Sequence, residues 1–288
     1  MKFAFMAAHR ETFKVGRMCN LLGVSPSGFY AWQQRPRSAR ETADQRLSDQ
    51  IRCIHAGSRQ TYGVPRVQVE LRETHGVRCS RKRVARLMRA SGLRAKVFPR
   101  FRITTQSDHR QPIAANLLPA QQPVQRADQV WVADITYIAT REGWLFLAAI
   151  LDLYSRRVVG WSMNGAMTHQ LVLNAFDMAV AQRQPARGLL HHSDRGTQYA
   201  CRAYQTALAA HGVRSSMSGA GRCYDNAAME SFFHTLKTEL VHHEQYARRQ
   251  DARRSIFEYI EVFYNRYRRH SALGYATPEQ FERQVTVA

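Results

Sequence analysis

The chain has 288 residues, enough for one large domain with a smaller one or for two to three modules, and 44% of them are hydrophobic, as in globular proteins. Its longest unbroken apolar run, Trp144–Leu151, is far shorter than a membrane span, and its first residues lack the sustained apolar stretch of a signal peptide. We therefore expect an intracellular protein with no membrane partner.

The net charge is strongly positive and unevenly distributed. Forty-two Lys and Arg against 22 Asp and Glu give +20, and the sequence pI is about 10.5. Residues 1–124 hold 23 basic and 7 acidic residues, a net charge of +16, whereas residues 125–288 hold 19 and 15, a net charge of +4. The first half therefore predicts binding to a polyanion such as DNA. A membrane-surface protein fits less well, because the basic helices lack a wide apolar face.

The cysteines indicate free thiols in a reducing compartment, because they are odd in number, scattered and never in a CxxC pair. They are Cys19, Cys53, Cys79, Cys201 and Cys223. The nearby histidines, His55 and His75, match no common zinc-finger spacing, which disfavours zinc.

Residues 1–38 are expected to form a small helical unit. A helix through Leu21 and Leu22 breaks at Gly23, and Ser25-Pro26 then caps a second helix. This helix, short turn and helix follow the helix-turn-helix plan, which many helical hairpins share. DNA contact and simple packing both remain open for this unit.

Residues 39–94 are expected to form a second, more basic helix-turn-helix module. Pro65 opens one helix and Ser80 caps another, RKRVARLMRA. On the second helix Lys82, Arg86 and Arg89 fall at i, i+4 and i+7, a basic stripe suited to DNA contact; the alternative is an ordinary solvated face. Residues 95–126, rich in Pro and Gln, predict a linker.

Residues 127–288 predict an α/β domain with a mixed five-stranded sheet flanked by helices. Apolar runs at 130–138, 144–153 and 156–162 predict a strand meander, followed by a helix at 168–182, a strand at 189–192, a helix at 202–210 and a strand at 213–217. A basic and aromatic helix is expected over 248–269; its apolar side chains should pack, and Arg268 and Arg269 are expected to contact the DNA backbone.

Three acidic residues occupy unusual positions in this second half. Asp134 lies inside an apolar strand, Asp194 just past a strand end, and Glu230 one turn into a helix within 221–240. An unpaired carboxylate inside a strand is costly to bury, so it must lie at the edge of the sheet, pair with another group or bind a cation. Three carboxylates brought together also repel one another unless a metal neutralises them. Oxygen ligands favour Mg²⁺ or Mn²⁺. Taken alone, the Glu230 helix is also consistent with an ordinary amphipathic helix whose charges face solvent.

The spacing of these residues resembles the catalytic triad of the DDE transposases and retroviral integrases. Thirty-five residues separate Asp194 from Glu230, and Lys237 follows seven residues later, as in that pattern. The segments WVADITYI, LDLYSRRVVGW, HHSDRGTQY, DNAAMESFFHTLKTEL and YNRYRRHSALGYATPEQF resemble the second-frame (OrfB) protein of the IS-three family of bacterial insertion-sequence transposases. Residues 43–93 also resemble the helix-turn-helix region that precedes the core in that family.

The resemblance implies an RNase H-like core that cleaves DNA and transfers strands. Asp134, Asp194 and Glu230 would bind two Mg²⁺ ions, for which Mn²⁺ could substitute. Lys237 would contact a DNA phosphate, and Arg195 would shape the site or touch DNA. The implied partners are transposon-end and target DNA, further copies of the chain, and the first-frame (OrfA) product or a fusion with it, in the bacterial cytoplasm near the nucleoid.

Two other functions fit the sequence, a non-catalytic DNA-binding regulator and an RNase H-type nuclease. Three residues near the triad also have alternative interpretations. Asn226 could form a hydrogen bond near the metals, or it could cap the helix that carries Glu230. His192 could be a packed side chain, or it could take part in the reaction. Asp152, at a turn after a buried strand, indicates a structural role.

Overall fold

The computed structural model describes residues 1–36, 38–96, 111–118, 123–219 and 226–286. Most of the expected linker, Cys223 and the start of the 221–240 segment lie outside these residues. Within the described ranges, no helix is both long and apolar enough to cross a membrane.

The N-terminal unit contains three helices, α1 (Lys2–His9), α2 (Val15–Leu22) and α3 (Pro26–Gln34). Gly23 ends α2 in the left-handed conformation (φ +61°), and Ser25 Oγ caps α3 by accepting a bond from Gly28 N at 3.0 Å, as expected. The sequence pattern does not predict α1, whose Met6 is fully buried against the other two helices.

The second helical unit comprises α4 (Ala39–Gly57), α5 (Val64–Glu73) and α6 (Arg81–Ala90). A capping box begins α4: Glu41 N donates to Ser38 Oγ, and Ser38 N donates to a Glu41 carboxylate oxygen at 2.8 Å. Ser80 caps α6 as expected. The apolar faces of the three helices share one core, made by Leu47, Ile51, Ile54, Tyr62, Val67, Leu71, Val84, Leu87 and Met88.

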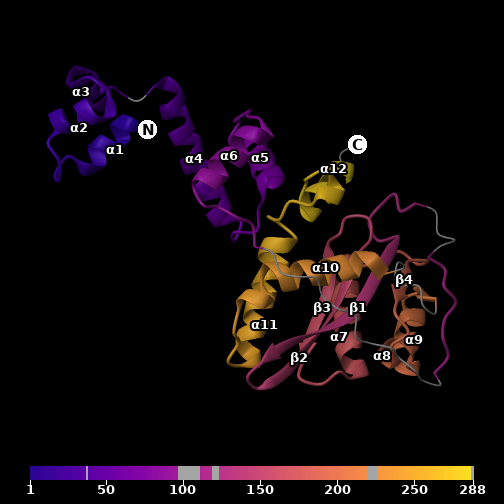
Figure 1. Cartoon of the computed structure of the whole chain (residues 1–288). Coiled ribbons are helices and arrows are strands. Elements are labelled where there is room, and N and C mark those ends of the chain that lie inside the picture. The colour runs from indigo at the N-terminus through magenta and orange to yellow at the C-terminus, as the bar shows by residue number, and fades with distance from the viewer. Residues whose placement is uncertain (37, 97–110, 119–122, 220–225, 287–288) are drawn as a thin grey trace.

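The second half of the chain folds around a five-stranded mixed sheet, which confirms the RNase H-like arrangement (Figure 1). Its strands are β1 (Val130–Thr140), β2 (Gly143–Asp152), β3 (Val158–Asn164), β4 (Leu190–Ser193) and β5 (Arg214–Met217). They lie in the order β3-β2-β1-β4-β5; the first three form an antiparallel meander, and β4 and β5 continue parallel to β1.

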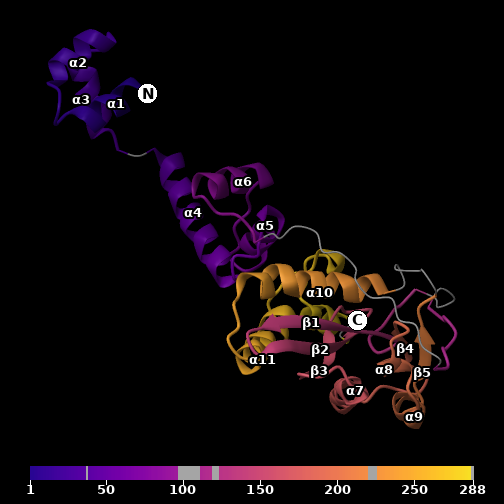
Figure 2. The same cartoon turned by 60° about the horizontal axis from the view of Figure 1, so that its bottom comes forward.

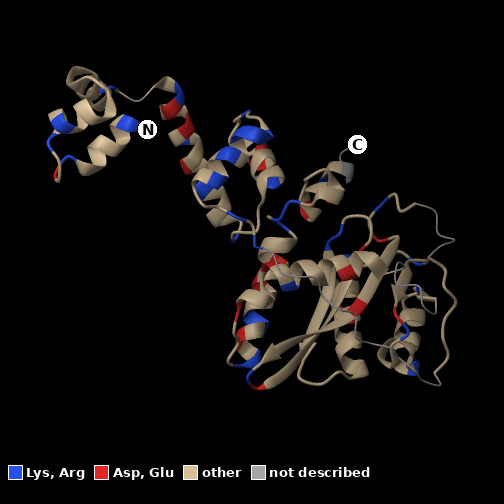
Figure 3. Cartoon of the chain, in the orientation of Figure 1, with Lys and Arg blue, Asp and Glu red and all other residues tan. Residues whose placement is uncertain are grey.

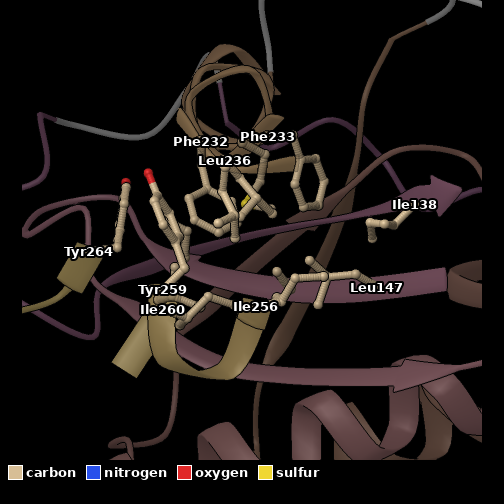
Figure 4. Close-up of a cluster of buried hydrophobic side chains, with 14 of the residues drawn as sticks. Ile138, Leu147, Phe232, Phe233, Leu236, Ile256, Tyr259, Ile260 and Tyr264 are labelled. Atoms are coloured by element: carbon tan, nitrogen blue, oxygen red, sulfur yellow. The ribbon is translucent and has the colours of Figure 1, made fainter. Parts of the chain in front are cut away.

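Helices cover both faces of the sheet (Figure 2). One face carries α7 (His169–Arg183), α8 (Thr197–Ala200) and α9 (Arg202–Ala210). Gly160 of β3 permits the close packing of α7, because a Cβ there would lie 2.3 Å from Ala175 O. The opposite face carries α10 (Ala227–Glu239) and α11 (Arg249–Phe257), whose apolar side chains interdigitate over β1 and β2 (Figure 4).

The helix expected over 248–269 is present from Arg249 to Tyr264, but it is shorter than expected and is not a regular α-helix throughout. After α11 the chain widens into a π-helical stretch, η3 (Glu258–Tyr264), in which Asn265 N donates to Ile260 O five residues earlier. Four of its residues, Tyr259, Ile260, Phe263 and Tyr264, are buried in the core beneath α10. The short helices η2 (Val241–His243) and η4 (Ser271–Leu273) and the C-terminal α12 (Pro278–Thr286) complete the described elements.

Candidate active site

The two aspartates of the expected triad lie at the same end of the sheet. Strands β1 and β4 pair from Val130↔Leu190 to Ala133↔Ser193, where β4 ends. Asp134 is the next residue of β1, and Asp194 is the next residue of the chain after β4. Because the strands are parallel and in register, the two aspartates lie side by side on neighbouring strands, at the point where β4 ends and β1 continues.

Local hydrogen bonds fix the backbone around both aspartates. Beyond the last β1–β4 pair, the N–H of Ile135 donates to Asp134 Oδ1 at 2.7 Å. Asp194 Oδ1 accepts a bond from Gly196 N at 2.9 Å, at the turn that precedes α8. Each carboxylate therefore has one oxygen held by the backbone.

Glu230 reaches this region on the first turn of α10. The helix packs on the β1 face of the sheet through Met229, Phe232 and Leu236, all at most 1% exposed, whereas Glu230 itself is exposed. Figure 4 shows Phe232 and Leu236 pointing from α10 toward the strands. The apolar stripe therefore anchors the helix and leaves the carboxylate of Glu230 outside the core.

The three carboxylates share one electrostatic environment. Loss of hydration, together with the charges of Asp194 and Glu230, raises the pKa of Asp134 from 3.8 to about 8, although the bond from Ile135 N and the charge of Lys237 oppose the shift. Among the described residues, no three His, Cys, Asp or Glu side chains are close enough to hold a metal ion as they stand.

Lys237 lies beside Asp134 and away from solvent. It is 7% exposed, and its Nζ lies 4.8 Å from the centre of the Tyr137 ring. Burial lowers the pKa of Lys237, and the carboxylate of Asp134 opposes that shift. The expected contact of Lys237 with a DNA phosphate is therefore corrected for this structure, because the lysine is largely enclosed between β1 and α10.

Arg268 and Arg269 are likewise corrected, because both guanidinium groups are engaged inside the protein. Arg268, 5% exposed, pairs with Glu239 at 2.7 Å, and Arg269, 8% exposed, pairs with Glu70 of α5. Neither presents a free cation to a phosphate in this structure, and their place is structural. Arg195 is partly exposed and donates through Nε to Ser218 O at 2.7 Å, close to Asp194 in the chain.

Figure 3 shows Lys and Arg gathered on α6, and the side chains of the expected basic stripe are exposed to solvent. Lys82, Arg86 and Arg89 are all exposed, on the side opposite the buried Val84. Arg86 pairs with Asp44 of α4 at 2.5 Å, an ion pair that the sequence did not reveal because 42 residues separate the partners. Hydrogen bonds from arginines of α6 hold the pKa of the Asp44 carboxyl below its usual value.

The structure also distinguishes between the alternatives left open for three nearby residues. Asn226 occupies the N-cap position of α10, but its side chain makes no cap hydrogen bond. His192 is buried, and its ring nitrogens lie 2.9 and 3.1 Å from the hydroxyls of Ser216 and Ser218, which favours packing. Asp152 is fully buried and accepts a hydrogen bond from Asp128 N at 2.7 Å, in keeping with a structural role.

A joint between the second helical unit and the core was not predicted from the sequence. The hydroxyl of Tyr62 donates to Tyr267 O at 2.9 Å and accepts from Arg269 N at 2.8 Å. Arg59 pairs with Glu258 at 2.6 Å. These partners are about 200 residues apart in the sequence, so no local pattern signals them.

Three segments match known family models. Residues 124–223 and 230–285 match models described as "Integrase core domain", and residues 42–101 match one described as "HTH-like domain". These matches place the chain among polynucleotidyl transferases with an integrase-type core preceded by an HTH-like domain.

Two proteins of similar sequence show to which family the chain belongs. "Transposase InsF for insertion sequence IS3A" of Escherichia coli (strain K12) is 44% identical over 284 residues, 98% of each chain. "Insertion element IS600 uncharacterized 31 kDa protein" of Shigella sonnei is 47% identical over 264 residues, 92% of this chain and 97% of that one. The chain belongs to the IS3 family of insertion-sequence transposases.

Solved structures give a weaker likeness. The HTLV-2 integrase catalytic core domain in complex with magnesium covers 55% of this chain and 97% of its own, with a TM-score of 0.42 and 15% identity. The family assignment rests on the sequence relatives alone.

Proposed function

We propose that Asp134, Asp194 and Glu230 are the metal ligands of a site that cuts insertion-sequence DNA and joins its 3′ ends to a target. The observation that carries this proposal is their placement: two carboxylates side by side on neighbouring strands and a third on a helix anchored across β1, all three contributing to one pKa shift. Perturbed carboxyl groups that share a site are typical of catalytic positions.

The residues fit a divalent cation. Asp134 resists ionisation because of its lost hydration and its acidic neighbours, and a cation would supply the positive charge that favours its ionised form. The donor atoms are all carboxylate oxygens, which suits two Mg²⁺ ions, with Mn²⁺ as a substitute. When bound, the metal would assist the attacking hydroxyl and stabilise the leaving oxygen of the phosphate.

The protein contributes position and rigidity. The bond from Ile135 N fixes one oxygen of Asp134, that from Gly196 N fixes one oxygen of Asp194, and the buried stripe of α10 fixes the path of Glu230. These contacts restrict the three carboxylates, so less conformational freedom is lost when a cation draws them together.

The DNA is bound in part by the second helical unit. Lys82 and Arg89 present exposed cations on α6, and Arg86 joins them while holding Asp44. Arg195 is the candidate contact near the carboxylates. Several copies of the chain assemble on paired transposon ends, alone or with the first-frame (OrfA) product. Light scattering of the protein bound to end DNA, which measures the number of copies, tests this assembly.

The test uses purified full-length protein and DNA carrying the ends of its insertion sequence. With Mg²⁺ the wild-type chain should nick at the end, and Glu230→Gln should abolish nicking while leaving DNA binding intact. Glu244→Gln is the matched control, because Glu244 is an exposed glutamate in the segment after α10. Nicking by Glu230→Gln at the wild-type rate would overturn the assignment, and cleavage confined to RNA–DNA hybrids would indicate an RNase H-type nuclease instead.

A further inference from the structure

Asn226 connects α10 to the strand that carries Asp134. Its Nδ2 donates to the backbone carbonyl of Ala133 at 3.2 Å. Ala133 is the last residue of β1 that pairs with β4, and it directly precedes Asp134. The asparagine also lies one helical turn before Glu230. Its amide therefore contacts the residue that precedes one proposed metal ligand, and its backbone lies one turn before another.

The orientation of this amide is set by its acceptor. A carbonyl oxygen accepts only from the NH₂ end of the amide, so Oδ1 must point away from Ala133. Asn226 is 7% exposed, and its Oδ1 is buried without a hydrogen-bond partner among the described residues. An amide oxygen removed from water without a partner is costly, and native proteins rarely retain one without a reason.

Asn265 shows how this chain treats an ordinary buried asparagine. It is 2% exposed, and both ends of its amide are used: Oδ1 accepts from Val158 N and Nδ2 donates to Val158 O, each at 3.0 Å. Asn265 therefore joins the π-helical segment to β3 with no polar atom left over. Asn226 differs from it in one respect, the unused oxygen.

We infer that Asn226 Oδ1 is a fourth oxygen donor of the cation site, acting on the metal directly or through one of its water molecules. The inference rests on the proposed function, because it requires that the three carboxylates bind a cation. A neutral amide oxygen suits this position, since it adds a hard donor without adding a fourth negative charge to three that already repel one another. The bond to Ala133 O would hold that oxygen still while the cation binds.

The experiment measures Mn²⁺ binding to the full-length protein without DNA, by electron paramagnetic resonance of the free ion. Asn226→Ala should weaken Mn²⁺ binding about tenfold, the effect of losing a supporting oxygen at a metal site. Asn226→Asp keeps an oxygen there and should bind Mn²⁺ more tightly than Asn226→Ala. Asn265→Ala is the matched control: it should lower thermal stability and leave Mn²⁺ affinity unchanged in the folded protein.

Two results distinguish a failure of this inference from a failure of the proposed function on which it rests. If Asp134→Asn loses Mn²⁺ binding while Asn226→Ala binds as the wild type does, the role of Asn226 is overturned and the carboxylate site stands. If Asp134→Asn binds Mn²⁺ as the wild type does, the carboxylate site itself fails. Loss of binding in Asn265→Ala, with its fold retained, would show that any buried asparagine has this effect and would also overturn the inference.

Discussion

Arg268 and Glu239 form an ion pair inside the protein, with Nη2 of the arginine 2.7 Å from Oε1 of the glutamate and both side chains at most 8% exposed. Glu239 is the last residue of α10, the helix that carries Glu230, and Tyr259 of η3 donates to it as well at 2.8 Å. The pair therefore ties the C-terminal segment to the far end of the helix that presents the proposed ligand.

Removing one partner of this pair should be strongly destabilising. Arg268→Met leaves the Glu239 carboxylate buried without its cation, which should cost about 3–5 kcal/mol in urea denaturation. Arg283→Met is the control, because Arg283 is exposed and its pair with Glu279 is worth at most about 1 kcal/mol. Equal losses in the two variants would contradict the structural role; weaker DNA binding at unchanged stability would restore the role first expected from the sequence.

Asp134→Asn should stabilise the metal-free protein in a pH-dependent way. The pKa of Asp134 is raised to about 8 in the folded chain, against 3.8 ordinarily. Below pH 3.8 the carboxyl is protonated in both states; as the pH rises from there to 8, the unfolded chain releases the proton that the folded chain retains, and stability falls. Asparagine has no such proton to release, so the variant avoids this loss of stability. Its free energy of unfolding at pH 8 should exceed that of the wild type by more than about 1.4 kcal/mol.

The measurement is urea denaturation in a chelator at pH 8 and at pH 5. The gain from Asp134→Asn should be smaller at pH 5, because less of the pH-dependent loss has accumulated there. An equal gain at both values would show that the carboxyl is not the cause.

The joint between the second helical unit and the core depends on Tyr62. Tyr62→Phe removes the hydroxyl that bonds Tyr267 O and Arg269 N, and should cost about 1–3 kcal/mol. Hydrogen exchange should therefore accelerate at the amide of Arg269. Tyr30→Phe, at an exposed tyrosine of the N-terminal unit, should leave that amide protected. Unchanged exchange in Tyr62→Phe would mean that the joint is held by its ion pairs alone.

The basic stripe of α6 should set part of the salt dependence of DNA binding. Replacing Lys82 and Arg89 together by Ala should reduce the slope of log affinity against log salt by about 2, one unit for each lost phosphate contact. Arg283→Ala removes an exposed cation from α12 and should leave the slope unchanged. The contradicting outcome is the same slope in the double variant as in the wild type.

The sequence predicted the sheet well, because strands depend on local signals. Alternating and continuous apolar runs identify strands, so all five begin and end within two residues of the expected positions, for example β4 at Leu190–Ser193. Asp134 and Asp194 were identifiable as carboxylates in or beside apolar strands. Their spacing relative to Glu230 matched the triad of a known family, a signal that none of the three residues gives alone.

Side-chain partners could not be predicted, because they depend on segments that meet only after folding. Arg268 and Arg269 lie in a basic stretch, and composition alone suggested DNA; their carboxylate partners are 29 and 199 residues away. Lys237 follows the family spacing, yet burial against Tyr137 depends on how α10 packs on β1. The division of the chain into four segments and the DNA contacts of Lys82 and Arg89 remain predictions.

If Asp134, Asp194 and Glu230 act as one metal-dependent site, each should be needed for joining an end oligonucleotide with a free 3′-hydroxyl to plasmid DNA in Mg²⁺. We expect Asp134→Asn, Asp194→Asn and Glu230→Gln each to lose joining while still binding the end DNA. Joining at the wild-type rate by any one of the three would contradict it.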